Sequence, residues 1–373
     1  MMDAVDTWLV TGGAGFIGVN FVKMLLAENL GRVVVLDALT YAGNLRSLEA
    51  EIAAGDIEFV KGDIGDADTV AALLDRIQPT YIVNFAAESH VDRSVDDPRP
   101  FVTTNVLGTQ NMLERARKYM AAGGPLKKFV QISTDEVYGD LDIDFENPCP
   151  LQDISEVLGR EVGVFGRESF SESSPLRPSS PYSASKAGAD MMALAYHRTF
   201  GLPVALTRCS NNYGPYQFPE KLIPLMINNI IEGRELPVYG KGLNVRDWIH
   251  VSDHCRGIIA VAVSGTPGQV YNFGGYAEAR NIDLVHTIID ILREWGIADG
   301  SALIRYVSDR PGHDRRYAID ASKSMAQLGW RPLVDPVSGF RDVVRWYVDN
   351  RSWVKNIVDG DYRDYYDKMY SNR

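Results

Sequence analysis

Thr11-Gly12-Gly13-Ala14-Gly15-Phe16-Ile17-Gly18 directly follows the short apolar run Thr7–Val10 and opens a helical stripe of apolar residues. The glycines stand where a strand must turn tightly into a helix, where a pyrophosphate approaches the backbone, and where the helix packs on the strand. The amino end of that helix adds free N–H groups and the positive end of a dipole. The stretch therefore predicts a dinucleotide site. Its predicted contacts are Gly12, Gly15, Phe16, Ile17 and Gly18.

An acidic residue at the end of the second predicted strand indicates which dinucleotide binds. Asp37 closes this strand about 20 residues after the glycines, the usual spacing. A carboxylate there accepts hydrogen bonds from ribose hydroxyls and repels a 2′-phosphate, which favours NAD over NADP. The alternative is a structural glycine turn beside an N-capping Asp. Asp63 and Ile64, which end the third strand, are predicted to contact the adenine, although a plain turn suits the same position.

The first half of the chain alternates short apolar runs with helical patterns. The runs are continuous in apolar residues, as expected for strands that are covered on both faces. They are Thr7–Val10, Arg32–Asp37, Ile57–Gly62, Tyr81–Ala86, Lys128–Ser133 and Val204–Arg208. This alternation predicts an α/β fold with a Rossmann-type, doubly wound parallel sheet.

Beyond about residue 210 the pattern changes to short helices, short strands and Gly/Pro turns. We predict a dinucleotide-binding domain over residues 1–210 and a smaller C-terminal α/β domain over 211–373, which would hold the substrate. No Ser/Gly-rich tether separates the two, so we expect them to be partly interleaved. Residues 140–180 have weak periodicity and several Pro, Gly and acidic residues, which predicts a long surface insertion or a lid.

The composition argues against several classes of function. The 373-residue chain carries a net charge of −11, whereas general binders of nucleic acid or membrane surfaces need an excess of Lys and Arg. Its three cysteines lie far apart in no paired motif, which indicates a reducing compartment and no metal site. The amino end is acidic, unlike a signal peptide, and no apolar run approaches the ~20 residues of a membrane span. We expect a cytoplasmic enzyme.

A tyrosine and a lysine four residues apart indicate redox chemistry. Tyr182 and Lys186 lie in Pro181-Tyr182-Ser183-Ala184-Ser185-Lys186, so a helix places them on one face. An ammonium group beside a phenol stabilises the phenolate, and we expect it to lower the pKa of Tyr182 with help from bound NAD⁺. A phenolate beside a nicotinamide is the base that takes the proton from an alcohol while hydride leaves its carbon.

Two adjacent carboxyl groups follow the fifth predicted strand, in Ser133-Thr134-Asp135-Glu136-Val137-Tyr138-Gly139. The carboxyl end of a strand in a parallel sheet opens into the ligand crevice. Close like charges drive the two pKa values apart, so Asp135 and Glu136 would supply one acid and one base to neighbouring substrate carbons. The alternative is that Thr134 caps a short helix whose dipole the two carboxylates favour.

Together the glycine motif, Asn84-Phe85-Ala86-Ala87, Asn105 and the Tyr182/Lys186 pair resemble the extended short-chain dehydrogenases, which modify nucleotide sugars. The resemblance covers nearly the whole chain and adds Ala86 and Asn105 to the NAD-binding residues. The Thr-Asp-Glu triplet looks like that of dTDP-glucose 4,6-dehydratases, whereas 4-epimerases usually lack these carboxylates. Further matching segments are Leu36–Asn44, Ala87–Ser94, Ser210–Pro215, Phe218–Pro224 and Arg310–Arg316. The 140–180 stretch is longer than in many relatives, which concerns the surface over the site and not its chemistry.

The resemblance implies an internal redox cycle on dTDP-glucose. Tyr182 takes the proton from the 4-hydroxyl as hydride passes to NAD⁺, with Thr134 hydrogen-bonding nearby. Glu136 then removes the hydrogen on carbon 5, while Asp135 protonates the departing 6-hydroxyl. Hydride returns to carbon 6, which yields dTDP-4-keto-6-deoxyglucose and restores NAD. Such an enzyme is a hydro-lyase of deoxysugar biosynthesis.

A sugar nucleotide also brings two phosphate charges to an acidic protein, so cations must be concentrated locally. Arginine suits forked phosphate contacts, although each candidate alone equally suits an ordinary salt bridge. By resemblance the substrate-binding residues are His90, Asn211, Lys221, Leu222, Tyr239, Arg246, Asn281, Arg310 and His313.

Related enzymes form homodimers through two long helices, which correspond here to Phe101–Tyr119 and Ala184–Phe200. The second carries more apolar surface than one buried face needs, so we predict a homodimer. The alternatives in function are a 4,6-dehydratase of another nucleoside-diphosphate glucose, a nucleotide-sugar 4-epimerase or decarboxylase, and a silent NAD-binding scaffold. The last would not need Tyr182, Lys186, Asp135 and Glu136.

Overall fold

The centre of the molecule is a seven-stranded parallel sheet with the strand order β12-β8-β5-β4-β1-β2-β3. The computed structural model describes residues 5–146, 149–298 and 303–357. The strands are β1 (Thr7–Thr11), β2 (Arg32–Asp37), β3 (Ile57–Lys61), β4 (Tyr81–Asn84), β5 (Lys128–Thr134), β8 (Val204–Cys209) and β12 (Val270–Phe273). All six predicted strands are present, and the predicted Rossmann-type fold is confirmed. The seventh strand, β12, comes from the second half of the chain.

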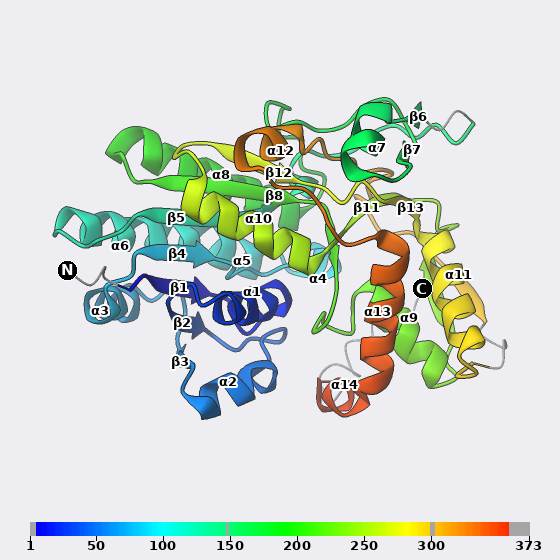
Figure 1. Ribbon diagram of the computed structural model, residues 1–373, viewed down its shortest axis with the longest axis horizontal. Helices are drawn as coiled ribbons and strands as arrows, with labels where there is room; N and C mark the ends of the chain where they lie inside the picture. Colours follow the sequence, from blue (N-terminus) through cyan, green and yellow to red (C-terminus); the bar gives the residue numbers. More distant parts are fainter. Residues whose placement is uncertain (1–4, 147–148, 299–302, 358–373) are drawn as a thin grey trace.

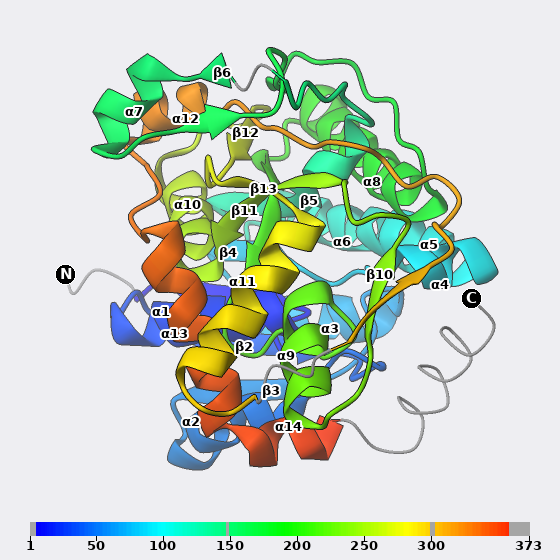
Figure 2. The same cartoon turned by 90° about the vertical axis from the view of Figure 1, so that its right-hand side faces the viewer.

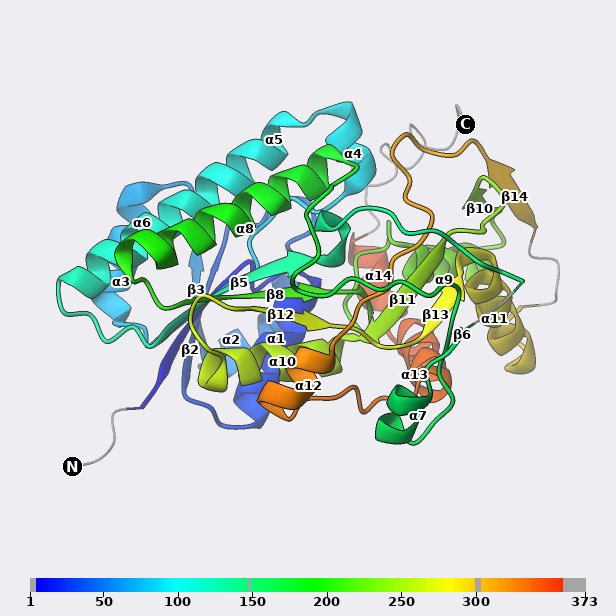
Figure 3. The ribbon, with the colours of Figure 1, turned by 90° about the horizontal axis from the view of Figure 1, so that it is seen from above.

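Helices cover both faces of this sheet (Figures 1 and 3). One face carries α3 (Ala67–Ile77), α6 (Thr109–Ala121) and α8 (Pro181–Phe200), and the other carries α1 (Phe16–Ala27), α10 (Val251–Ser264) and α12 (Ser322–Leu328). Within β1, Leu9 belongs to the core under the first set, while Trp8 and Val10 belong to the core under the second. Successive residues of each strand are therefore buried on opposite faces, which explains the continuous apolar runs.

The rest of the second half forms a smaller body with its own apolar core beside the carboxyl ends of the sheet strands (Figure 2). Its elements are β9 (Asn211–Tyr213), α9 (Leu222–Ile231), β10 (Leu236–Tyr239), β11 (Val245–His250), β13 (Glu278–Arg280), α11 (Asn281–Glu294), β14 (Ile304–Val307), α13 (Pro336–Asp349) and α14 (Arg351–Ile357). Because α10, β12 and α12 return to the large sheet, the chain crosses between the two bodies more than once. The division at residue 210 stays a prediction, and residues 358–373 of its second part lie outside the described residues.

Shorter elements connect these parts of the fold. They are η1 (Leu45–Leu48), α2 (Glu49–Ala54), α4 (Val91–Asp96), α5 (Arg99–Phe101), η2 (Val102–Gly108), η3 (Asp135–Val137), β6 (Cys149–Pro150), α7 (Gln152–Leu158) and β7 (Gly163–Val164). The last three lie within the predicted insertion, residues 140–180.

The insertion is tied to the smaller body by two arginines. The Arg160 guanidinium donates to the carbonyl oxygens of Gly275 and Tyr276, at 2.7 and 3.1 Å. Arg316 and Glu278 form a bidentate ion pair at 2.7 and 2.9 Å, with both side chains 1% exposed. The same arginine donates to the carbonyl oxygen of Glu168, inside the insertion.

Replacing Glu278 by Gln is expected to lower the free energy of unfolding by about 3–5 kcal/mol, because it leaves the buried Arg316 charge uncompensated. Urea titration followed by tryptophan fluorescence measures this loss. The matched control is Asp290→Asn, which breaks an exposed ion pair with Arg293 and should cost at most about 1 kcal/mol. Equal losses of unfolding free energy in the two variants would show that the buried ion pair stabilises the fold no more than the exposed one.

Residues 5–146, 149–298 and 303–357 contain neither a candidate metal-binding cluster nor a candidate membrane span. No group of three or more His, Cys, Asp or Glu side chains there lies close enough to hold a metal ion. No helix in the same ranges is long and apolar enough to cross a membrane.

Candidate active site

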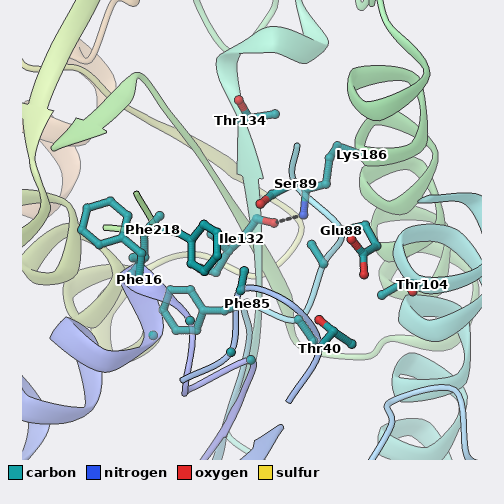
Figure 4. A pocket seen from close by; sticks show the side chains of 18 of the residues that line it. Phe16, Thr40, Phe85, Glu88, Ser89, Thr104, Ile132, Thr134, Lys186 and Phe218 are labelled. Carbon is teal, nitrogen blue, oxygen red and sulfur yellow. Dashed lines mark hydrogen bonds between the residues drawn. The ribbon is translucent and has the colours of Figure 1, made fainter. Parts of the chain in front are cut away.

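A cavity of about 310 Å³ opens at the carboxyl ends of β1, β2, β4, β5 and β8. Of the predicted site residues, sixteen line it: Gly12, Gly15, Phe16, Ile17, Gly18, Asp37, Asp63, Ile64, Ala86, Thr134, Asp135, Glu136, Tyr182, Lys186, Asn211 and Lys221. Figure 4 shows the rings of Phe16, Phe85 and Phe218 on one side of the cavity and Lys186 on the other. The fold thus brings together residues from both halves of the chain.

The glycine turn fits the backbone of a dinucleotide. Gly12 has a φ of +68°, and a Cβ there would lie 2.6 Å from the backbone nitrogen of Ala86. The helix that follows, α1, has Gly15 as its N-cap, without a side-chain capping bond and without an acidic residue in its first turn. Its amino end is therefore open to an anionic group.

Asp37 lies where the ribose of a dinucleotide is expected. Its carboxylate accepts hydrogen bonds from the backbone N–H groups of Ala14 and Leu39, at 2.9 and 2.8 Å. Burial raises the pKa of this carboxyl and the two N–H groups oppose the rise. The bond to Ala14 fixes Asp37 to the glycine turn, so that the turn and the acid form one unit. These residues suit NAD.

Tyr182 and Lys186 lie one turn apart in α8, which begins with a capping box at Ser180 and a proline at its first position. The Lys186 ammonium donates to the carbonyl oxygen of Ile132 at 2.7 Å, the bond drawn in Figure 4. Burial and then the charge of Glu136 raise the pKa of Tyr182 well above its usual value, against a hydrogen bond with Thr134. Asp135 adds to this rise, so the lowering of the phenol pKa by Lys186 and bound NAD⁺ stays a prediction.

Asp135 and Glu136 form the short helix η3, and the Thr134 hydroxyl accepts from the Glu136 N–H, as the capping alternative predicted. Both carboxyl groups nevertheless line the cavity, so a capping role for Thr134 is compatible with catalytic roles for Asp135 and Glu136. Burial, Glu136 and Asp247 raise the pKa of Asp135 well above its usual range. Burial also raises the pKa of Glu136, but the charges of Arg310, Lys221 and Arg246 oppose it. The two carboxyl groups therefore differ in their surroundings, because the cations that oppose the rise are more numerous at Glu136 than at Asp135.

Cations gather near this pair. Arg310, Lys221 and Arg246 are the three positive charges that act on Glu136. The Lys221 ammonium donates to the carbonyl oxygen of Ser89 at 3.2 Å, and Arg246 donates to the carbonyl oxygen of Asp314 at 2.9 Å. These carbonyl oxygens orient the two side chains, and the concentration of three cations beside the cavity suits an anionic ligand.

Polar atoms near these cations also lack partners. Asn211 Oδ1, Asn281 Oδ1 and Arg310 Nε are buried and have no hydrogen-bond partner within the part of the chain that the structure describes. Buried polar atoms are rarely left unpaired in native proteins. A polar ligand would satisfy them.

The remaining predicted residues do not line the cavity. Buried His90 lies with its Nε2 3.6 Å from the Glu220 carboxylate, and His313 Nδ1 lies 2.6 Å from the Asp309 carboxylate. Tyr239 packs against the His313 ring at 6.0 Å between centroids. Leu222 and Asn281 are the first residues of α9 and α11.

Asn105 is predicted to contact NAD but lies behind the cavity wall. Its side-chain amide accepts from the N–H of Glu88 at 2.8 Å, and donates to the Glu88 carbonyl oxygen at 3.0 Å and to the Ser185 hydroxyl at 2.8 Å. This buried amide therefore ties the segment after β4 to α8 between Tyr182 and Lys186.

The sequence analysis missed Glu220, a cavity-lining carboxyl next to Lys221. Its Oε2 lies 3.6 Å from both His90 Nε2 and Arg93 Nη2. Burial raises its pKa to about 7, and the neighbouring Lys221 and Arg93 charges oppose the rise. The available signal was an acidic residue between Pro219 and Lys221 in a matching segment, but it gave no direction for the side chain.

A comparison of sequences identifies the family. The family model described as GDP-mannose 4,6 dehydratase matches residues 9–343. The dTDP-glucose 4,6-dehydratase of Xanthomonas campestris pv. campestris (strain B100) is 50% identical over 366 residues, 96% of this chain and 97% of the relative. That of Salmonella typhimurium (strain LT2) is 47% identical over 371 residues, 98% of this chain and 99% of the relative.

Solved structures agree with this. DesIV, a dTDP-glucose 4,6-dehydratase from Streptomyces venezuelae with NAD and TYD bound, has a TM-score of 0.82 and 47% identity over 94% of this chain and 99% of that one. The UDP-glucose 4-epimerase of Thermotoga maritima with UDP-glucose has a TM-score of 0.78 but only 26% identity over 92% and 99%. The chain therefore belongs to the GDP-mannose 4,6 dehydratase family and, within it, to the dTDP-glucose 4,6-dehydratases.

Proposed function

We propose that this protein is an NAD-dependent hydro-lyase that converts dTDP-glucose to dTDP-4-keto-6-deoxyglucose. The observation that carries the proposal is the division of labour in one cavity: a phenol at Tyr182, a carboxyl whose pKa is far raised at Asp135, and a carboxyl that faces three cations at Glu136. A 4-epimerase needs the phenol but neither an acid at carbon 6 nor a base at carbon 5. The activity named for the relatives supports the same assignment.

NAD would be held by the turn Gly12–Gly18 and Asp37, with Asp63 and Ile64 near the adenine and Ala86 and Lys186 toward the nicotinamide. Gly12, Gly15 and Gly18 would leave room for the pyrophosphate at the open end of α1. Asn105 would act from behind, through the segment after β4 that it fixes. When bound, NAD accepts hydride from carbon 4 of the sugar and later supplies it to carbon 6.

In the first step Tyr182 takes the proton of the 4-hydroxyl, with Thr134 as its hydrogen-bonding neighbour. The resulting 4-ketone acidifies the hydrogen on carbon 5. Glu136 removes that proton, the electron pair forms the bond between carbons 5 and 6, and the bond from carbon 6 to oxygen breaks as Asp135 gives its proton to the leaving hydroxyl. Water leaves, Asp135 is now ionised and Glu136 protonated, and a proton returns to carbon 5 when carbon 6 is reduced.

The phosphates of the substrate would lie against Arg310, Lys221 and Arg246. The Oδ1 atoms of Asn211 and Asn281, which have no partner in the described chain, would accept hydrogen bonds from N–H or hydroxyl groups of the substrate. His90, Leu222, Tyr239 and His313 would form the wall farther from the sheet. Arg310 is partly exposed and suits a forked phosphate contact.

Mass spectrometry of the protein incubated with dTDP-, UDP-, CDP- and GDP-glucose, with no NAD added, tests the proposal. Loss of one water from dTDP-glucose alone is the expected result, and it would also show that NAD stays bound through purification. Loss of water from another nucleotide sugar would show that the enzyme prefers, or also accepts, a base other than thymine. Unchanged masses for all four, after NAD is supplied as well, would refute the dehydratase assignment.

The enzyme is expected to be a homodimer. Apolar side chains are exposed along η2 and α8, which lie side by side: Val102, Leu107, Met191 and Phe200 are 46–57% exposed. Light scattering should give about twice the 41.4 kDa of one chain. Leu107→Glu should yield monomers by placing charge in the buried interface, whereas Val337→Glu, on exposed α13, should not. A wild-type monomer at micromolar concentration would contradict the prediction.

We also place the enzyme in the cytoplasm. Cys149, Cys209 and Cys255 are all free thiols, which suits a reducing compartment. A sugar nucleotide is also a substrate of cytoplasmic metabolism. Fractionation of cells expressing the full chain tests this.

A further inference from the structure

We propose that Asp247 is a positioning residue for the elimination step: as the ionised member of a pair of buried carboxyl groups, it keeps the acid proton on Asp135. Asp247 lies in β11, outside the cavity lining, and neither sequence motif nor resemblance assigned it a role. The inference rests on the function proposed above, because it concerns the acid that protonates the leaving hydroxyl.

The fold brings the two carboxyl groups together across one segment. In the large sheet Thr134 pairs with Cys209, and in the small sheet Trp248 pairs with Asn211. When each ladder is continued by one residue, Asp135 and Asp247 both come beside Ser210, whose side chain also lowers the pKa of Asp247. Both side chains are buried, at 2% exposure, and Asp247 is one of the charges that act on Asp135.

Hydrogen bonding decides which of the two is ionised. Asp247 accepts from the backbone N–H groups of Gly275 and Ala277, at 2.9 and 2.8 Å, one on each oxygen. Asp135 has only the Thr134 hydroxyl, at 3.3 Å, and its Oδ2 is buried without a partner in the described chain. Two N–H donors stabilise a carboxylate, whereas a buried oxygen without a donor favours the neutral acid. The negative charge therefore belongs on Asp247 and the proton on Asp135.

The pKa directions agree with this assignment. Burial raises the pKa of Asp247 to about 6, with the Ala277 N–H opposing the rise and the Glu278 charge adding to it. Burial, Glu136 and Asp247 raise the pKa of Asp135 well beyond its usual range. With Asp247 ionised, the pair holds one proton, on Asp135. This arrangement supplies a neutral carboxylic acid at neutral pH, as leaving-group protonation requires.

Other charged and titratable groups face the pair from each neighbouring element. They are Glu136 on η3, Arg246 on β11, Tyr182 on α8, Cys209 on β8, Glu278 on β13, Tyr276 before β13, and Arg160 in the insertion. The guanidinium of Arg246 lowers the pKa of Asp135. Asp247 offsets this neighbouring cation, so that Arg246 can attract phosphate without ionising the acid beside it.

Asp247→Asn removes the charge and keeps the shape. The pKa of Asp135 should fall, so the activity lost as pH rises through that pKa is lost at lower pH. We expect the basic limb of the kcat profile to move down by about one pH unit, which means an about tenfold lower kcat on dTDP-glucose at alkaline pH. Below about pH 6 the two enzymes should converge, because wild-type Asp247 is itself protonated there.

Two readouts separate this role from simple damage to the fold. Reduced nicotinamide should form at the wild-type rate after dTDP-glucose is mixed with Asp247→Asn, because oxidation at carbon 4 does not use Asp135. A substrate with fluorine at carbon 6 should be turned over at nearly the wild-type rate, because fluoride leaves with its electron pair and needs little protonation. Equal slowing on both substrates, or slow formation of reduced nicotinamide, would overturn the proposal.

Asp253→Asn is the matched control. Asp253 is also a buried carboxyl that accepts two backbone N–H groups, those of Leu333 and Val334, but it lies in α10 away from the cavity. Its variant should keep the wild-type pH profile. A shift of the profile in this control as large as in Asp247→Asn would count against a specific role of Asp247.

Infrared difference spectroscopy of the otherwise unaltered protein tests the proposal if Asp247→Asn fails to fold. The C=O stretch of a protonated carboxylic acid should be present at pH 8 and be missing in Asp135→Asn. Absence of this band from the wild-type enzyme would overturn the inference. Failure of wild type to dehydrate dTDP-glucose would instead refute the proposed function, and the spectrum would still report where the proton lies.

Discussion

Tyr182→Phe is expected to lower kcat by about 100- to 10,000-fold, because it removes the base that accepts the proton of the 4-hydroxyl. Oxidation at carbon 4 precedes every other step, so neither reduced nicotinamide nor a keto sugar should accumulate. Stopped-flow absorbance of reduced nicotinamide after mixing with dTDP-glucose measures the step directly. NAD content should be retained, since the turn Gly12–Gly18 and Asp37 are untouched.

The control for this variant is Tyr196→Phe on the same helix. Tyr196 accepts a hydrogen bond from Gln110 at 2.9 Å and does not line the cavity. Its variant should keep the rate of oxidation and lose only some stability. If Tyr182→Phe still reduced NAD at the wild-type rate, another group would have to be the base, and the role given to Tyr182 would be wrong.

Asp135→Asn is expected to block the cycle at a later point. Oxidation should proceed, but loss of water should slow by about 100- to 10,000-fold, since an amide cannot give a proton to the leaving hydroxyl. Reduced nicotinamide and the 4-keto sugar should therefore accumulate together. Rapid quenching followed by mass spectrometry would show a product two hydrogens lighter than dTDP-glucose, with the oxygen on carbon 6 retained.

Asp142→Asn is the control for the loss of a carboxyl. Asp142 pairs with Arg315 at 2.8 Å on the surface, with its side chain 90% exposed, so its variant should turn over normally. Undiminished loss of water in Asp135→Asn would remove the distinction from a 4-epimerase. Comparison with Tyr182→Phe then shows the order in which the two residues act. Asp135→Asn should form reduced nicotinamide before it stops, whereas Tyr182→Phe should not form it.

Much of the fold was predictable because its determinants are local. The turn Gly12–Gly18 has no room for a side chain at Gly12 and Gly18, and the apolar runs are continuous because each strand is covered on both faces. The strand ends were predicted to within about two residues, the usual uncertainty of such boundaries. Strand β12 was missed because Val270–Phe273 is four residues long and lies in the second half, where the sheet was not expected.

Site residues were also predictable only where their determinants are local. Residues within the motifs at the ends of β1, β2 and β5 and at the start of α8 do line one cavity. Of the residues assigned only by resemblance, Ala86, Asn211 and Lys221 line it, whereas Asn281 and His313 do not. Glu220 and Asp247 were missed because neither stands in a motif with a known spacing, and their side chains act through contacts more than a hundred residues away.

The sequence by itself therefore determined the doubly wound sheet, the NAD turn and the groups proposed as acid, base and phenol, since spacing and backbone requirements are local. Only the tertiary structure decided the surroundings of these groups. The Lys186 ammonium is hydrogen-bonded to the Ile132 carbonyl oxygen, and burial and the Glu136 charge raise the pKa of Tyr182. The proton of Asp135 depends on Asp247, which folding brings beside it from 112 positions along the chain (247 − 135). Electrostatic interactions act through space and burial, so the order of residues cannot fix them.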